Sequence, residues 1–137
     1  MEDNLPLLPP KNISEWLTLN LKNRFGIPVY STWSSDLTDF QSGSKSLPKE
    51  FIQVDYQAFF PVKTESGSII NYEKIFTLYI KYQGDLEELT DDLVEWLSGI
   101  EYFKTQKGEH SINVQGGQPD QDNNSNVMII QLNISQF

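Results

Sequence analysis

Two neighbouring segments in the middle of the chain alternate apolar and polar side chains, and this pattern restricts the fold more than any other feature. In residues 51–60 the even positions carry Ile, Val, Tyr, Ala and Phe, while positions 53, 55 and 57 carry Gln, Asp and Gln. Residues 70–82 alternate similarly, with Phe76, Leu78, Ile80 and Tyr82 on one side. A period of two is that of a strand with one buried face. The connection 61–69 is short, so the two strands are expected to pair as a long, projecting antiparallel β-hairpin.

Two further segments have helical spacing. Residues 13–25 and 86–97 each place apolar side chains along one stripe. Asn12 and Asp85 precede them, and a Glu follows each three residues later, as in a capping box. Gly26 and Gly99 are the expected ends of the two helices.

The remaining segments complete the sheet. Short strands are expected at 27–33, 100–105 and 111–115, and a longer one at 127–135. Residues 34–49 and 115–126 are expected to be loops, because the first has few apolar side chains and the second has none. The order helix, three strands, helix, three strands predicts an α+β fold: a mainly antiparallel sheet with two helices packed on one face.

The length of 137 residues fits one domain. Residues 1–12 contain prolines among leucines and are expected to form an extended N-terminal arm, followed by a single α+β domain over 13–137.

Composition excludes several classes of protein. The chain has no Cys and a net charge of −9, which disfavours disulfide frameworks, thiolate chemistry and binding to nucleic acid or anionic membranes. Its N-terminus lacks the basic and apolar regions of a signal peptide, and no apolar run reaches the roughly 18 residues of a membrane span. We expect a soluble protein made in the cytoplasm.

Residues suited to catalysis or to metal binding do not form a recognisable set. His110 lies in a polar sequence and is expected to be a surface turn residue. Asp120-x-Asp122-x-Asn124 only partly matches a calcium loop, since the expected Gly is Ser125. The paired carboxylates Glu87-Glu88 and Asp91-Asp92 fit a solvated helix face. We therefore expect no catalytic residue, metal or cofactor, and no enzyme.

In size and in the order of its parts, the chain resembles the tail-terminator (tail-completion, or neck) proteins of long-tailed bacteriophages. The resemblance rests on the helix 14–25 leading into Gly26-Ile27-Pro28-Val29-Tyr30, and on Leu47-Pro48-Lys49-Glu50 before the strand at 51–56. It continues through the hairpin partner at 72–82 and Gly84-Asp85 to the helix at 86–97.

The resemblance implies a structural virion protein. Such proteins form a hexameric ring that caps the tail tube, joins it to the head connector, and lets DNA pass through its lumen. The expected partners are thus other copies of the chain, a tail tube protein and a head-connector protein.

Two other functions remain open from the residues. The first is an acidic inhibitor or immunity-type protein that binds a basic partner. The second is a small enzyme with a pocket near His110 or Asp91.

The surfaces expected to contact partners lie in the arm, the loops and the hairpin turn. Trp16, Trp33 and Trp96 are expected mainly in or beside the core, although Trp33 and Trp96 also suit an interface. The candidate interface residues are Leu7, Leu8, Trp33, Lys63, Glu65, Ser66, Gly67, Asp120 and Asp122.

Overall fold

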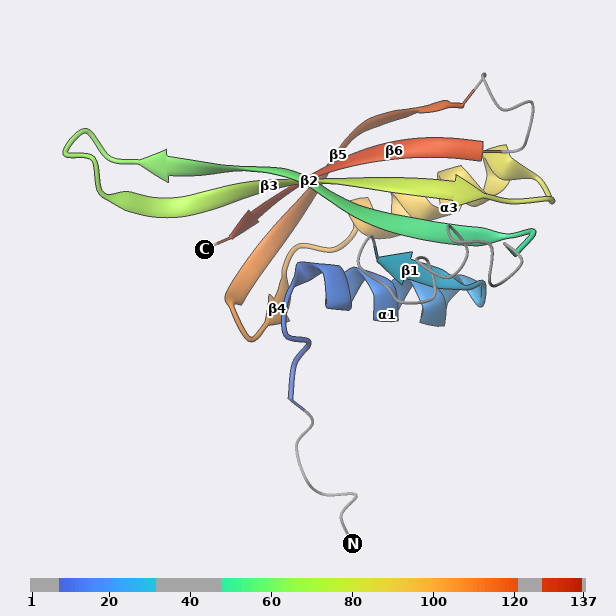
Figure 1. Ribbon diagram of the computed structural model, residues 1–137, viewed down its shortest axis with the longest axis horizontal. Coiled ribbons are helices and arrows are strands. Elements are labelled where there is room, and N and C mark those ends of the chain that lie inside the picture. The colour runs from blue at the N-terminus through green and yellow to red at the C-terminus, as the bar shows by residue number, and fades with distance from the viewer. Residues whose placement is uncertain (1–7, 32–47, 121–126, 137) are drawn as a thin grey trace, which may run out of the picture.

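The computed structural model describes residues 8–31, 48–120 and 127–136, with the side chain of Ile70 excepted. Figure 1 shows its elements, which follow the predicted order of one helix, three strands, one helix and three strands. They are α1 (Ile13–Phe25), β1 (Val29–Ser31), β2 (Phe51–Lys63), β3 (Ile69–Lys81), α3 (Leu86–Ser98), β4 (Phe103–Thr105), β5 (Gly108–Pro119) and β6 (Val127–Gln136).

The strands form one sheet in the order β1-β2-β3-β6-β5-β4. β1 runs parallel to β2, and every other neighbouring pair is antiparallel. The prediction of an α+β fold with a mostly antiparallel sheet is therefore confirmed.

One face of the sheet and the apolar stripes of both helices make a common core. Directly paired residues of an antiparallel ladder project to the same face, so Ile52 and Ile80 lie together, as do Val54 and Leu78. Leu17 and Leu21 of α1 and Leu93 and Leu97 of α3 belong to the same buried cluster, each with 0% of its surface exposed. We call this side of the sheet the front face and the opposite side the back face.

The helix ends follow the capping chemistry expected from the sequence. The side chain of Asn12 accepts a hydrogen bond from the Glu15 amide, and that of Asp85 accepts one from the Glu88 amide. Gly26 adopts φ 70°, a left-handed conformation that glycine adopts without strain, and its N–H donates to the Lys22 carbonyl. These contacts fix where α1 and α3 begin and where α1 stops.

Aromatic side chains join the two helices to the β4 end of the sheet. The rings of Trp16 and Trp96 are stacked with centroids 6.3 Å apart, and Trp16 also stacks on Phe103 at 4.0 Å. Trp16 and Trp96 are both half-buried and pack against the core. The spacing of the apolar residues placed Trp16 on the stripe of its helix and Trp96 beside the stripe of the other.

The chain before α1 is attached to the β4–β5 turn. The backbone N–H of Gln106 donates to the Pro10 carbonyl at 2.8 Å, and its side chain donates to the Pro9 carbonyl at 3.1 Å. Leu8, one residue earlier, is 82% exposed.

The bounds of several strands differ from the sequence-based expectation. β4 spans Phe103–Thr105 and not the whole of 100–105. β5 continues to Pro119, so residues 115–119 form a strand and not a loop. Backbone pairing with β6 requires no apolar side chain, which is why this part of β5 gave no signal in the sequence. The expected strand at 27–33 is shorter than predicted within the described residues, where β1 spans Val29–Ser31.

No helix in the described ranges combines the length and the apolarity needed to cross a lipid bilayer.

Candidate assembly surface

The ends of β2 and β3 and their turn project at the far left of Figure 1, well beyond both helices. We call the segment from Tyr56 to Phe76 the projecting hairpin. Within the described strands, β1 pairs with β2 only at Ile52, Gln53 and Val54, and β6 pairs with β3 only as far as Tyr72. The tip of the projecting hairpin is therefore two-stranded.

The turn of the projecting hairpin has its own hydrogen bonds. The amide of Thr64 donates to the Ser68 carbonyl, and the amide of Gly67 donates to the Thr64 carbonyl, each at 2.9 Å. Gly67 adopts φ 90°, which accounts for a glycine at this position. The candidate residues Lys63, Glu65, Ser66 and Gly67 all lie here and are exposed.

A β-bulge divides the aromatic residues of β2 between the two faces. The register shifts between Tyr56, which pairs with Phe76, and Ala58, which pairs with Ile75. Phe59 then pairs with Lys74 on the front face, and Phe60 pairs with Glu73 on the back face. The prediction that Ala58 and Phe60 share a face with Ile52 is wrong, because one extra residue reverses a period-two alternation.

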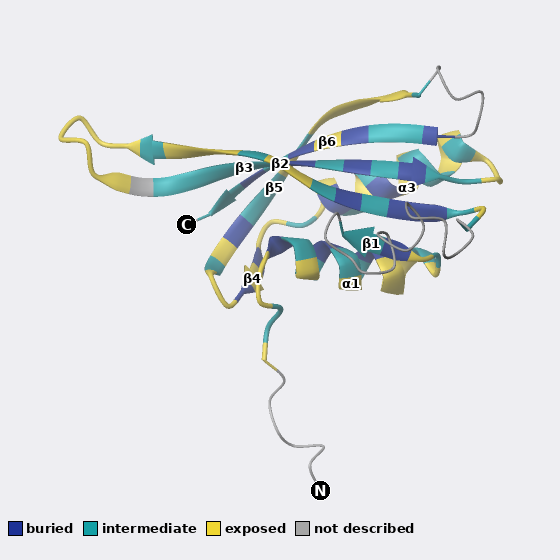
Figure 2. Ribbon diagram, in the orientation of Figure 1, coloured by how far each residue is buried: buried dark blue, intermediate teal, exposed yellow. Residues whose placement is uncertain are grey.

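Large apolar side chains are exposed on both faces of this hairpin. Tyr56 is 44% exposed, Phe59 57%, Phe60 55% and Ile69 50%. In Figure 2 the hairpin is mostly coloured exposed, in contrast to the buried stretches of the same strands over the helices. Beyond the Tyr56–Phe76 pair, no helix in the described residues covers either face of the hairpin. Its exposed apolar side chains therefore form a group, and not the scattered single residues that are normal on a protein surface.

On the front face these aromatic residues lie beside a lysine. The ring of Tyr56 stacks on Phe76 at 4.9 Å, and the rings of Phe59 and Tyr72 are 6.4 Å apart. The ammonium of Lys74 lies 5.8 Å from the centre of the Tyr56 ring, within cation–π range. Burial raises the pKa of Tyr56, whereas burial and then the charge of Lys107 lower the pKa of Lys74.

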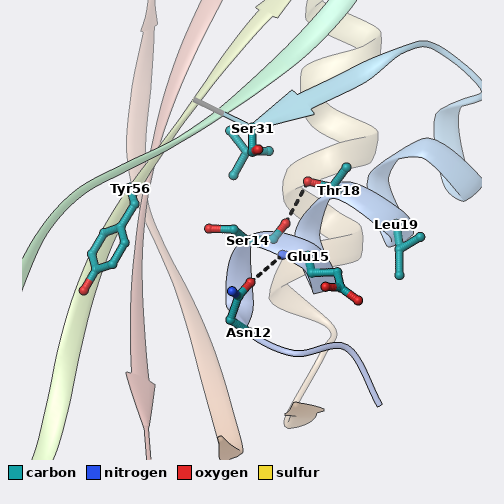
Figure 3. A pocket seen from close by; sticks show the side chains of 8 residues that line it. Asn12, Ser14, Glu15, Thr18, Leu19, Ser31 and Tyr56 are labelled. Carbon is teal, nitrogen blue, oxygen red and sulfur yellow. Dashed lines mark hydrogen bonds between the residues drawn. The ribbon is translucent and has the colours of Figure 1, made fainter. Parts of the chain in front are cut away.

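A groove lies where the projecting hairpin leaves the helical layer. It has a volume of about 510 Å³ and is lined by the first turns of α1, Ser31 of β1, and Val54 and Tyr56 of β2. Figure 3 shows Tyr56 across the groove from Asn12 and Ser14, whose own polar groups take part in helix hydrogen bonds. The groove extends the front-face aromatic surface toward α1.

The free edges of β2 and β5 are poorly suited to pairing with another strand. The exposed side-chain faces of the hairpin are better suited to packing. The outer edge of β2 carries the bulge near Gln57 and also Pro61, which lacks an amide hydrogen. β5 has its own bulge between Val114 and Gly116. Bulges and proline are common protections of edge strands, so partner contacts are expected through the side chains.

The other candidate interface residues are dispersed. Leu8 lies before α1, and half-buried Asp120 donates its N–H to the Val127 carbonyl at 3.0 Å, at the opposite end of the sheet from the hairpin turn. Leu7, Trp33 and Asp122 lie outside the described residues, as does most of the expected loop at 34–49. Among the candidates that the structure describes, the four turn residues are the ones that lie on the projecting hairpin.

The structure corrects the expectation for His110. It is fully buried in β5, with 0% exposure, and its ring stacks on Phe103 at 5.0 Å. Its Nε2 atom is 2.7 Å from the Thr105 hydroxyl, while Nδ1 has no hydrogen-bond partner. The surface-turn prediction is wrong because cross-strand pairing with Phe103 turns His110 inward, although both sequence neighbours are polar.

The carboxylates of α3 are solvated, as the sequence suggested. Glu87, Glu88, Asp91 and Glu95 are exposed, and the guanidinium of Arg24 donates to the Asp92 carboxylate at 2.9 Å. The described ranges contain no cluster of three or more His, Asp or Glu suited to a metal ion.

Comparison with known proteins adds no assignment. No protein-family model matches this sequence, and no curated protein matches it either. The candidate surface is therefore defined by its residues, their exposure and their contacts alone.

Proposed function

We propose that this protein is a structural assembly subunit of the tail-terminator kind. In this proposal, copies of the chain form a ring on the end of a phage tail tube. The ring stops growth of the tube, joins it to the head connector, and passes DNA through its lumen. The protein acts by presenting surfaces and not by catalysis.

The single observation that carries the proposal is the projecting hairpin with aromatic residues exposed on both faces. The tip beyond Tyr72 is two-stranded, and a two-stranded segment is only marginally stable alone in water. Phe59 on one face and Phe60 on the other leave more than half of each side chain exposed. Burial of such side chains supplies most of the affinity of typical protein interfaces. A hairpin that is apolar on both sides is suited to insertion between two protein surfaces.

The arrangement of layers supports the same function. The helices pack on the front face of the sheet around the core, and the long hairpin leaves this layer at one end. A ring subunit requires separate surfaces for its neighbours and for the next component of the assembly. The net charge of −9 suits a lumen in which DNA must move without adhering.

The acidic face of α3 favours a second candidate function. An inhibitor or immunity-type protein would use those carboxylates to bind a basic enzyme as a monomer or a dimer. This alternative gives no role to the exposed aromatic residues of the projecting hairpin, which is why the structural subunit is preferred.

Substitution of the aromatic residues tests the proposal. We expect the double variant Phe59→Ser, Phe60→Ser to stay folded, because both side chains are already exposed. Its self-association should weaken by at least about tenfold, the effect of losing an interface anchor. Sedimentation velocity over a concentration series measures this change, and circular dichroism checks the fold.

The matched control is Tyr102→Ser, which removes an aromatic side chain that is 63% exposed outside the projecting hairpin. The control should assemble as the unchanged protein does. Equal assembly of the double variant and the unchanged protein would show that the hairpin is not an assembly surface.

A further inference from the structure

The front face of the projecting hairpin carries a positive charge that no carboxylate among the described residues neutralises in an ion pair. Lys74 lies among Tyr56, Phe59 and Tyr72. The β4–β5 turn that carries Lys107 is joined to the strand beside β3, since the Gln136 side chain donates to the Lys107 carbonyl at 3.0 Å and Gln136 pairs with Tyr72. Besides burial, the charge of Lys107 also contributes to lowering the pKa of Lys74. No described carboxylate forms an ion pair with either lysine. We call the two lysines, Tyr56, Phe59 and Tyr72 the lysine–aromatic surface. Repulsion between the two ammonium groups favours an anionic partner.

The outer face of α3 has the opposite character. Its sequence contains five acidic residues and no Lys or Arg. Glu87, Asp91 and Glu95 follow one another at intervals of four, so they are neighbours on one side of the helix. Like charges at this spacing repel one another and destabilise a helix. Glu88 lies beside them, and all four are exposed. We call Glu87, Glu88, Asp91 and Glu95 the acidic face of α3.

The hairpin turn and the start of α3 lie at opposite ends of the molecule. In Figure 1 the hairpin turn is at the far left, and the loop that leads into α3 is at the far right. Among the described residues, no ion pair joins the two surfaces within one chain. Contact between copies would bring four carboxylates against two ammonium groups.

We propose that the lysine–aromatic surface of one copy docks against the acidic face of α3 of a second copy. This inference rests on the proposed function and specifies the contact between subunits. The contact is heterologous, since it joins two different surfaces of the chain. A row of subunits joined by heterologous contacts has one unused surface of each kind at its two ends. The row closes into a ring when the rotation between neighbouring subunits permits. The aromatic residues would be covered, and the charges would set the register.

Reversal of charge on one side of the contact at a time provides the test. The variant Lys74→Glu, Lys107→Glu should lose self-association by on the order of tenfold or more, and so should Asp91→Lys, Glu95→Lys. Mixing the two variants should restore assembly, because each supplies the surface that complements the other. Sedimentation velocity of each variant and of the equimolar mixture measures these effects.

Matched charge reversals outside both surfaces are the controls. Lys104→Glu changes an exposed lysine of β4, and Glu101→Lys changes an exposed acid before β4. Both controls should assemble as the unchanged protein does. Self-association of the unchanged protein should also weaken as NaCl is raised, since salt screens exposed charges.

The outcomes separate this inference from the proposed function. If the unchanged protein assembles and the reversed variants assemble equally well, the contact is wrong while the structural function stands. If both reversed variants lose self-association and their mixture does not regain it, the proposed contact is also wrong. If the unchanged protein is monomeric at every concentration, both proposals fail.

Discussion

His110 is enclosed between Phe103 and the hydroxyl of Thr105, and its Nδ1 atom has no hydrogen-bond partner. Thr105 also accepts a hydrogen bond from the Lys107 amide. Protonation would give the ring a second N–H with no acceptor and would place a charge in a buried site. Burial, and then the charge of Lys74, accordingly lower the pKa of His110 below its ordinary value.

This environment predicts a pH dependence of stability. As the pH falls through about 6.5, the unfolded chain binds a proton at His110 before the folded protein does, so the free energy of unfolding decreases. The contribution is fully present above this range and is lost progressively below it. We expect His110→Gln to weaken the decrease between pH 7 and pH 5, as measured by urea unfolding. Parallel pH profiles for the two proteins would contradict this account.

At the scale of single elements, the capping residues predicted the helices well. The side chains of Asn12 and Asp85 accept the predicted hydrogen bonds, because capping depends on residues within one turn. Features set by neighbouring strands were not predictable in the same way. The bulge near Gln57 and the inward position of His110 depend on register with β3 and β4, which a local pattern does not contain.

The same reasoning applies to the candidate surface. Lys63, Glu65, Ser66 and Gly67 were found from turn chemistry alone. Phe59 and Phe60 were missed as surface residues because an aromatic side chain in an alternating strand usually faces a core. Two adjacent aromatic residues that interrupt the alternation were the available signal.

The N-cap of α3 gives a prediction for the stability of that helix. Asp85→Ala removes the acceptor for the Glu88 amide and a negative charge at the positive end of the helix dipole. We expect the free energy of unfolding to fall by about 1 kcal/mol. Chemical denaturation measures the change, with Ser98→Ala at the exposed end of α3 as the control. A loss no greater than that of the control would show that the cap contributes nothing.

At the scale of the whole molecule, the core and the candidate surface meet at the Tyr56–Phe76 pair and otherwise occupy different parts of the sheet. The buried residues lie where α1 and α3 cover the sheet, and the exposed aromatic residues lie where β2 and β3 extend past the helices. Variants of the projecting hairpin should therefore change assembly with little change in folding. In the proposed assembly, this arrangement would let one chain fold around its core while large apolar side chains stay available to a neighbouring subunit.

Electron microscopy of the purified, concentrated protein tests ring formation most directly. The account predicts closed rings with a central opening, and six-fold averages if the resemblance to tail terminators is correct. The variant Phe59→Ser, Phe60→Ser should give no rings on the same grids. Monomeric particles alone, or rings that persist unchanged in that variant, would contradict the account.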